Sequence, residues 1–271
     1  MKELMNILVY ITYDGILDPL GQSQIAPCVK NAAKTFDIVY VLSWEKPLNL
    51  AGLLDTSCFP DKVVWIKRKF NKGPSRKVGD LISMIWTLFF TVLKLGGRKK
   101  IVIHCRGHVG AAATWLACMV LQRMRNILVL FDYRGDWISE RVDKGGWSYD
   151  SLLDRLSINV WRWLEFKVLH WADHINTLTA RSAERISDIY SVDREKISVI
   201  PCAVDNSLFK VDPDARMRLK SFFPDLSPET VVLGYLGSIG PMYRFYSFVN
   251  LAKILVSQNP RKKFIFFVMT N

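Results

Sequence analysis

Three side chains that bind anions or move protons stand at alternate positions of one short segment: His104, Arg106 and His108. They follow the apolar run Ile101–His104, and in open parallel sheets ligands lie beyond the carboxyl ends of the strands. Two imidazoles and a guanidinium suit neutralisation of a phosphate or transfer of a proton. The alternative is a strand-end histidine that only binds a backbone carbonyl. We expect no zinc, because no cysteine or carboxylate accompanies the histidines at ligand spacing.

A second polar group, Asp132 and Arg134, follows the apolar run Ile127–Phe131. If the strand continues, side chains two residues apart share one face of it. The pair then either forms a salt bridge that shapes the loop or offers a carboxylate to a substrate hydroxyl. Trp137, three residues further on, either stacks on a sugar ring or packs in the interior.

A third candidate is the loop from Tyr13 to Gln24, which follows the first apolar run and opens a helix. Glycines such as Gly21 allow a tight turn, and free backbone N–H groups at the start of the helix can receive a phosphate or a carboxylate. The loop does not match the Gly-x-Gly-x-x-Gly dinucleotide fingerprint. An ordinary turn between a strand and a helix is the alternative.

Continuous apolar runs alternate with helix-length segments along the chain. These elements must position the three candidate sites around His104, Asp132 and Gly21. Runs without polar alternation indicate strands that are covered on both faces. The expected strands are 6–12, 38–42, 63–66, 101–104, 127–131, 175–178 and 197–200, and the expected helices are 22–35, 80–94, 107–125, 151–171 and 180–191. This pattern predicts an α/β fold, a Rossmann-like parallel sheet wrapped by helices.

The pattern breaks after Pro201 and then starts again. Residues 211–228 contain three prolines and little periodicity, which indicates a connection between domains with a short helix. Beyond it we expect a strand at 231–236, a helix at 245–257 and a strand at 264–269. A lone βαβ unit cannot cover both faces of its strands. We therefore expect a first domain at 1–205, a connection at 206–230, and the start of an incomplete second Rossmann-like domain at 231–271.

Charge and cysteine content narrow the possible partners. The formal net charge is +12, and residues 62–100 hold eleven Lys or Arg against a single acid, Asp80. Such a zone favours nucleic acid, anionic lipid or a phosphorylated substrate as a partner, or else it is only a solvated face.

The five cysteines are scattered without a Cys-x-x-Cys pair, which fits a reducing cytoplasm. The early run Ile7–Thr12 is too short for a signal peptide.

Two segments raise the question of a membrane. The 13 residues Leu81–Leu93 carry no charge, yet a spanning helix needs about 20. They indicate either a buried helix or a helix lying on a membrane between Lys/Arg clusters. The second segment, 151–171, carries Trp161, Trp163 and Trp171. These favour core packing, with membrane-interface contact as the alternative.

Five stretches, in order along the chain, resemble the family 4 glycosyltransferases, particularly the bacterial members that build surface polysaccharides. They are Tyr13–Gln24, His104–His108, Phe131–Trp137, Lys196–Asp205 with Phe209, and Leu233–Gly240. The resemblance implies a GT-B fold, in which an amino-terminal domain holds the acceptor and a carboxyl-terminal domain binds a nucleotide sugar. It also implies retention of anomeric configuration, no metal and no cofactor beyond the nucleotide-sugar co-substrate.

The resemblance assigns roles to residues on both sides of the implied cleft. On the acceptor side, Gly21, Gln22 and Ser23 approach the donor phosphates. The proposed catalytic group there is His104, Arg106, Asp132 and Arg134, although many relatives have a histidine where Asp132 stands.

On the donor side, Gly237 and Ser238 begin the phosphate loop. Ser238 and Tyr243 replace the usual Arg and Lys, for which Arg244 is the expected substitute.

The leading hypothesis is therefore a hexosyl or other glycosyl transferase that moves sugar from a nucleotide sugar to a saccharide or lipid-linked saccharide. We expect a cytoplasmic protein, peripheral at the anionic inner face of the plasma membrane. Because the family's donor-binding glutamates are expected beyond residue 271, we expect little transfer by this chain alone. A non-catalytic binding or scaffold protein of the same fold is the alternative. No aromatic–basic module supports nucleic-acid binding, so we expect no nucleic-acid partner.

Overall fold

The computed structural model describes residues 5–46, 59–71, 74–96, 99–121, 126–204, 206, 209–240 and 243–270, with residues 74–77 described by their backbone. The chain divides into two compact units, and the main division falls between Cys202 and Ala203. The boundary expected from the sequence, residue 205, lies three residues further on. Each unit is described by itself below.

The first unit is built on a parallel sheet, which in the described residues has seven strands. They are β1 Met5–Thr12, β2 Ile38–Glu45, β3 Val63–Lys69, β4 Lys99–Arg106, β5 Ile127–Tyr133, β6 His174–Thr177 and β7 Ile197–Val199. Their order across the sheet is β3-β2-β1-β4-β5-β6-β7. The order reverses between β1 and β4, as in doubly wound α/β folds, so the predicted fold class is confirmed.

Four strands run at least two residues past their expected ends, because β2 continues to Glu45, β3 to Lys69, β4 to Arg106 and β5 to Tyr133. The expected ends at residues 42, 66, 104 and 131 are therefore wrong. The register pairs Arg106 with Asp132, so the backbone ladder continues through polar residues. Arg106 and Asp132 are consequently held by the sheet itself.

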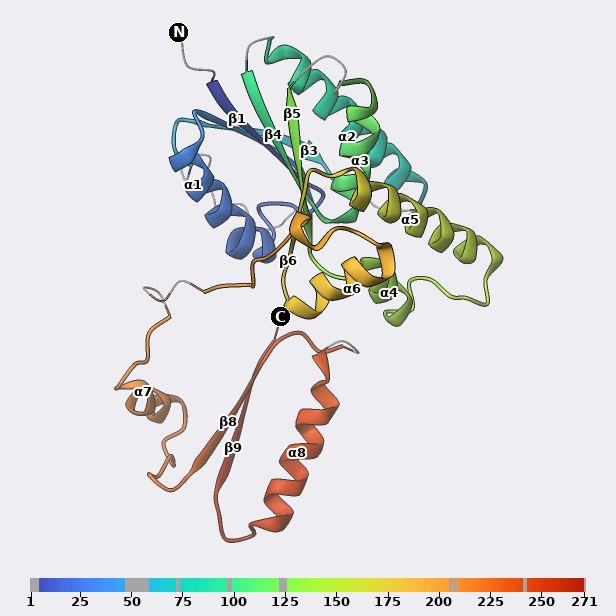
Figure 1. The fold of residues 1–271 in the computed structure, drawn as a ribbon. Coiled ribbons are helices and arrows are strands. Elements are labelled where there is room, and N and C mark those ends of the chain that lie inside the picture. The colour runs from blue at the N-terminus through green and yellow to red at the C-terminus, as the bar shows by residue number, and fades with distance from the viewer. Residues whose placement is uncertain are drawn as a thin grey trace. The chain divides into compact units, whose positions relative to one another are not determined.

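Helices cover both faces of this sheet (Figure 1). A π-helical turn, Gly21–Ile25, leads into α1, Ala26–Thr35, on one face. On the other face, α3 packs against both α2 and α5. The bounds of the remaining helices are α2 Pro74–Lys94, α3 Gly107–Leu121, α4 Trp137–Asp143, α5 Leu152–Trp171 and α6 Ala180–Tyr190, with a 3-10 turn at Arg194–Lys196. The sequence extended α3 to residue 125, but 122–125 lie outside the described residues.

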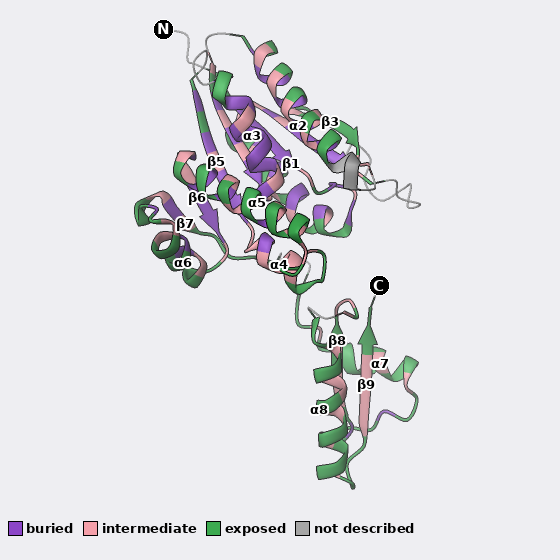
Figure 2. Ribbon diagram, turned by 90° about the vertical axis from the view of Figure 1, so that its right-hand side faces the viewer, coloured by how far each residue is buried: buried purple, intermediate pink, exposed green. Residues whose placement is uncertain are grey.

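Alternating strand side chains divide the core into two clusters. Ile7, Val9 and Ile11 join the cluster beneath α2, α3 and α5, whereas Leu8 and Tyr10 join the one beneath α1. Helix α3 is buried along most of its length, while α2 and α5 keep exposed outer faces (Figure 2). In the described part of the chain, no helix is both long and apolar enough to cross a bilayer.

The second unit contains one βαβ arrangement. Strands β8 Val231–Leu236 and β9 Phe264–Met269 pair in parallel and are joined through α8 Phe245–Gln258. Helix α7, Ala215–Phe222, precedes them. Both strands have the bounds expected from the sequence.

Candidate functional site

A cavity of about 320 Å³ opens at the carboxyl ends of the central strands of the first unit. Its lining includes residues that follow β1, β4, β5 and β6, and it lies where the strand order reverses. Doubly wound sheets bind their ligands at this place. The polar and aromatic residues that line it include Tyr13, Asp14, Gln24, Arg106, Arg134 and Trp137.

Two guanidinium groups in this cavity are held by one amide. Gln24 Oε1 accepts a hydrogen bond of 2.7 Å from Nη2 of Arg106 and another of 2.7 Å from Nη2 of Arg134. Gln24 comes from the π-helical turn before α1. It belongs to the Tyr13–Gln24 motif, but the sequence assigned it no role, because its partners lie 82 and 110 residues away.

Asp132 lies beneath the two arginines with its side chain only 4% exposed. Its carboxylate is 3.5 Å from Arg106 Nη1, 3.7 Å from Arg134 Nη1, and accepts a 3.3 Å hydrogen bond from Asn176 Nδ2. Burial alone would raise the pKa of Asp132, but its neighbours His104, Arg134 and Arg106 more than offset this and lower it. Asp132 and Arg134 therefore share a face, and the carboxylate holds both guanidiniums.

His104 packs beside Tyr10 and Asp132. Its ring centroid is 4.4 Å from that of Tyr10, and its Nε2 lies 3.6 Å from Asp132 Oδ2, beyond hydrogen-bond distance. Three polar atoms around Asp132 have no hydrogen-bond partner among the described residues: His104 Nε2, Arg106 Nε and Asn176 Oδ1. His104 and Asp132 support the cavity from below, whereas Arg106 and Arg134 line it.

His108 belongs to a different cluster. Its Nε2 lies 2.8 Å from Oε1 of Glu165 on α5, and its ring stacks on Trp137 at 5.8 Å between centroids. Tyr133, Tyr190 and Arg162 also bind the Glu165 carboxylate. Burial alone would raise the pKa of Glu165, but His108, Tyr190 and Arg162 more than offset this and lower it. The sequence analysis placed His108 in one group with His104. In the structure, His108 instead binds Glu165, and only part of the His108 side chain lines the cavity.

The predicted phosphate turn has another geometry. The backbone N–H of Gln22 donates to the carbonyl of Asp18 at 2.9 Å and is therefore not free. A Cβ on Gly21 would lie 2.0 Å from the Gly15 carbonyl oxygen, which makes Gly21 a close-packing position. The exposed Ser23 uses its hydroxyl to bind the Leu20 carbonyl. The helix begins before Gly21, so the Gln22 N–H and the Ser23 hydroxyl form hydrogen bonds within it.

The three donor-side residues lie in the second unit. Gly237 has φ +153° directly after β8, and Ser238 accepts a 2.8 Å hydrogen bond from the Tyr235 hydroxyl at its carbonyl. Both line a hollow of about 270 Å³ at the carboxyl ends of β8 and β9. Arg244 has φ +48° at the start of α8. Among the described residues, no group of three or more His, Cys, Asp or Glu is placed to hold a metal ion.

The first unit is a doubly wound α/β domain with a cavity where the strand order reverses. Residues 57–208, more than half of the chain, match the model of Glycosyltransferase Family 4. The chain belongs to this family. No curated protein sequence gives a significant match.

Solved structures share the fold at low sequence identity. Sucrose-phosphate synthase from Thermosynechococcus elongatus is 14% identical with a TM-score of 0.57, over 98% of this chain and 71% of that one. The catalytic domain of starch synthase IV from Arabidopsis thaliana, bound to ADP and acarbose, is 12% identical with a TM-score of 0.59, over 98% and 68%. Anabaena HepE in complex with UDP is 14% identical with a TM-score of 0.53, over 97% and 69%.

Proposed function

We propose that this protein transfers a hexose from a nucleotide sugar to a saccharide or lipid-linked saccharide, with retention of configuration and without a metal ion. The observation that carries the proposal is the pair Arg106 and Arg134, held by Gln24 at the cavity where the strand order reverses. Family membership supports sugar transfer in general. HepE was solved with UDP, which supports a nucleotide sugar as the donor class here.

The two guanidiniums supply the charge that the reaction needs. A nucleoside diphosphate leaves as an anion, and preorganised donors that stabilise developing charge are usually the largest catalytic contribution. Arginine also binds phosphate oxygens through two parallel hydrogen bonds. Arg106 and Arg134 thus contact the anionic part of the substrates. Asp132 and His104 act as positioning residues, because they lie beneath the arginines rather than on the cavity wall.

The remaining assignments extend the same proposal. Gly237, Ser238 and Arg244 form the donor side, and Gly21, Gln22 and Ser23 shape the acceptor-side turn. Surface-polysaccharide synthesis would place the protein in the cytoplasm, peripheral at the inner face of the plasma membrane. The basic zone of residues 62–100 supports this location, because anionic lipids attract such a zone.

Because we expect little transfer by this chain alone, the test joins the chain to the donor-binding domain of a family member. It measures transfer of radiolabelled sugar from UDP-glucose and GDP-mannose to a bacterial lipid-linked saccharide fraction, in the presence of EDTA. The proposal expects transfer that survives EDTA and falls at least about a hundredfold in Arg106→Gln, as for loss of one charge-stabilising donor. The control is Arg155→Gln, which changes an exposed arginine on α5. Binding of donor without any transfer would overturn the enzymatic proposal in favour of a binding protein, and loss of transfer in EDTA would overturn metal independence.

A further inference from the structure

Helix α2 carries a ridge of exposed apolar residues. Val78, Ile82, Trp86 and Phe90 are 60%, 49%, 54% and 52% exposed and follow one another at four-residue intervals, and Lys94 continues the series. Residues four apart are neighbours on a helix surface. The opposite side of α2 is anchored in the core through Met84, Leu88 and Val92. The ridge is therefore a fixed feature of a well-packed helix.

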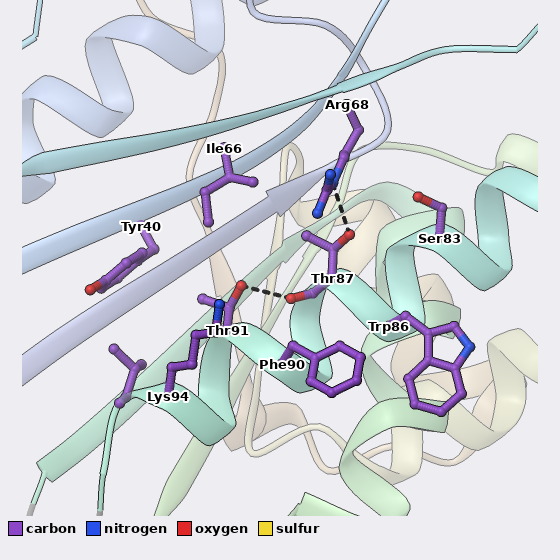
Figure 3. A pocket seen from close by; sticks show the side chains of 10 residues that line it. Tyr40, Ile66, Arg68, Ser83, Trp86, Thr87, Phe90, Thr91 and Lys94 are labelled. Atoms are coloured by element: carbon purple, nitrogen blue, oxygen red, sulfur yellow. Dashed lines mark hydrogen bonds between the residues drawn. The ribbon is translucent and has the colours of Figure 1, made fainter.

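A pocket of about 370 Å³ lies beside the ridge, between α2 and the strands β2 and β3. Figure 3 shows Trp86 and Phe90 at its outer side and Arg68 and Lys94 among its polar residues. Arg68 Nε donates a 3.2 Å hydrogen bond to Thr87 Oγ1, which holds the guanidinium over the helix. The lining of the pocket contains two cations and no acid. Its charge and its aromatic rim therefore match a molecule with an anionic head and an apolar body.

This pocket is separate from the cavity of the candidate active site. The two share no lining residue, and the active-site cavity draws on residues after β1, β4, β5 and β6. The pocket uses Tyr40 and Ile66 from within β2 and β3 together with the last three turns of α2. A ligand in it would not compete with a substrate for the same groups.

We propose that α2 is the surface by which the protein lies on a bilayer that contains anionic lipid. The ridge inserts at the boundary between headgroups and acyl chains, and Arg68 and Lys94 bind lipid phosphates at the pocket. An interfacial helix needs both an apolar face and flanking cations, and α2 has both. This deepens the membrane location in the proposed function, but its test involves no sugar transfer.

The experiment is flotation of the whole chain with vesicles of phosphatidylglycerol and phosphatidylcholine, and with vesicles of phosphatidylcholine alone. The wild type is expected to float with the anionic vesicles. The double variant Trp86→Ala/Phe90→Ala removes the exposed rings, and Arg68→Gln/Lys94→Gln removes the cations. Each is expected to weaken binding by on the order of tenfold. Only the cation effect is expected to shrink as salt rises, because salt screens exposed charges.

Matched controls separate this surface from the rest of the molecule. Leu153→Ala/Leu156→Ala removes apolar residues from α5 that are even more exposed than Trp86 and Phe90, and Arg261→Gln/Lys262→Gln removes the same charge from the second unit. Both controls are expected to float like the wild type. The proposal is overturned if the α2 variants, folded by circular dichroism, bind as the wild type does, or if the α5 variant loses as much binding.

Sugar transfer and membrane binding can be told apart with one more variant. Arg106→Gln is expected to float like the wild type while losing transfer, since Arg106 lies in the other cavity. Flotation that fails in every α2 variant with transfer intact on a soluble acceptor would support the surface and leave the enzymatic proposal standing. If Arg106→Gln also lost flotation, the separation of the two sites would be wrong.

Discussion

Arg106 and Arg134 stand at the ends of adjacent strands and donate hydrogen bonds of equal length, 2.7 Å, to the same side-chain oxygen. Two like charges are thereby held close together with one neutral acceptor, Gln24, between them on the cavity side. Asp132 balances them from below. An anion that enters the cavity meets two donors that are already oriented, which is the preorganisation that charge stabilisation requires.

Gln24→Glu should stabilise the folded protein and weaken its binding of an anionic ligand. A carboxylate between the two guanidiniums forms charged hydrogen bonds, so the free energy of unfolding should rise by about 1 kcal/mol. The added negative charge should weaken binding of UDP by at least about tenfold, because it repels the diphosphate. Denaturation and calorimetric titration measure the two effects. Asn31→Asp adds the same charge to an exposed position of α1 and should leave UDP binding unchanged.

Asp132→Asn should destabilise the first unit by about 3 kcal/mol near neutral pH, because it leaves buried arginine charge without its carboxylate. The pKa of Asp132 is lowered in the folded state. Its contribution is therefore complete above the unfolded value of about 4 and is lost as pH falls through the lower folded pKa. The stability gap between wild type and variant should close at acid pH. All nine tryptophans lie in the first unit, so their fluorescence follows its unfolding. The exposed Asp188→Asn should show no such gap.

Gly21→Ala should lower the free energy of unfolding by about 3 kcal/mol. The new Cβ would lie 2.0 Å from the Gly15 carbonyl oxygen, and neither backbone segment moves easily. Gly79→Ala is the matched control, because a Cβ there meets no atom within 4 Å. Alanine favours the helix at this position of α2, so the control should gain about 0.5–1 kcal/mol. Equal stability of the two variants would contradict the packing role of Gly21.

Glu165→Gln should cost about 3 kcal/mol, because the carboxylate is buried and has both His108 and Arg162 as partners. Tyr190→Phe removes one hydroxyl from the same carboxylate and should cost about 1 kcal/mol. The two changes share a partner, so the double variant should deviate from additivity by at least about 0.5 kcal/mol. A double-mutant cycle followed by tryptophan fluorescence measures this coupling, and strict additivity would mean that the two groups act independently.

Local patterns predicted the elements well and the site only in part. Strands β8 and β9 have their expected bounds, because each is a β-branched or aromatic run between turn residues. Arg106 and Asp132 were expected in loops, since polar residues at the end of an apolar run suggest that a strand has stopped. In the structure the backbone ladder with neighbouring strands carries both strands further. Sequence alone cannot show that ladder.

The residues that the sequence missed are those whose partners lie far away in the chain. In the sequence, Gln24 resembles an ordinary helix residue, and only the fold brings Arg106 and Arg134 to its side chain. In the sequence, Glu165 resembles a solvated charge on a helix. In the structure, packing of α5 against β5 and α3 buries it beside His108. Gly21 was recognised as special, but for phosphate access instead of close backbone contact.

The two edges of the sheet that the described residues form bear on how the protein behaves at high concentration. An exposed edge strand offers unpaired N–H and C=O groups to a second molecule and so invites aggregation. At one edge, β3 ends in three consecutive cations, Lys67, Arg68 and Lys69, and at the other edge β7 is only three residues long. Charge repulsion at β3 and shortness at β7 both oppose pairing between copies. Neutral substitutions at positions 67–69 would therefore lower the solubility of the folded protein, independently of any effect on ligand binding.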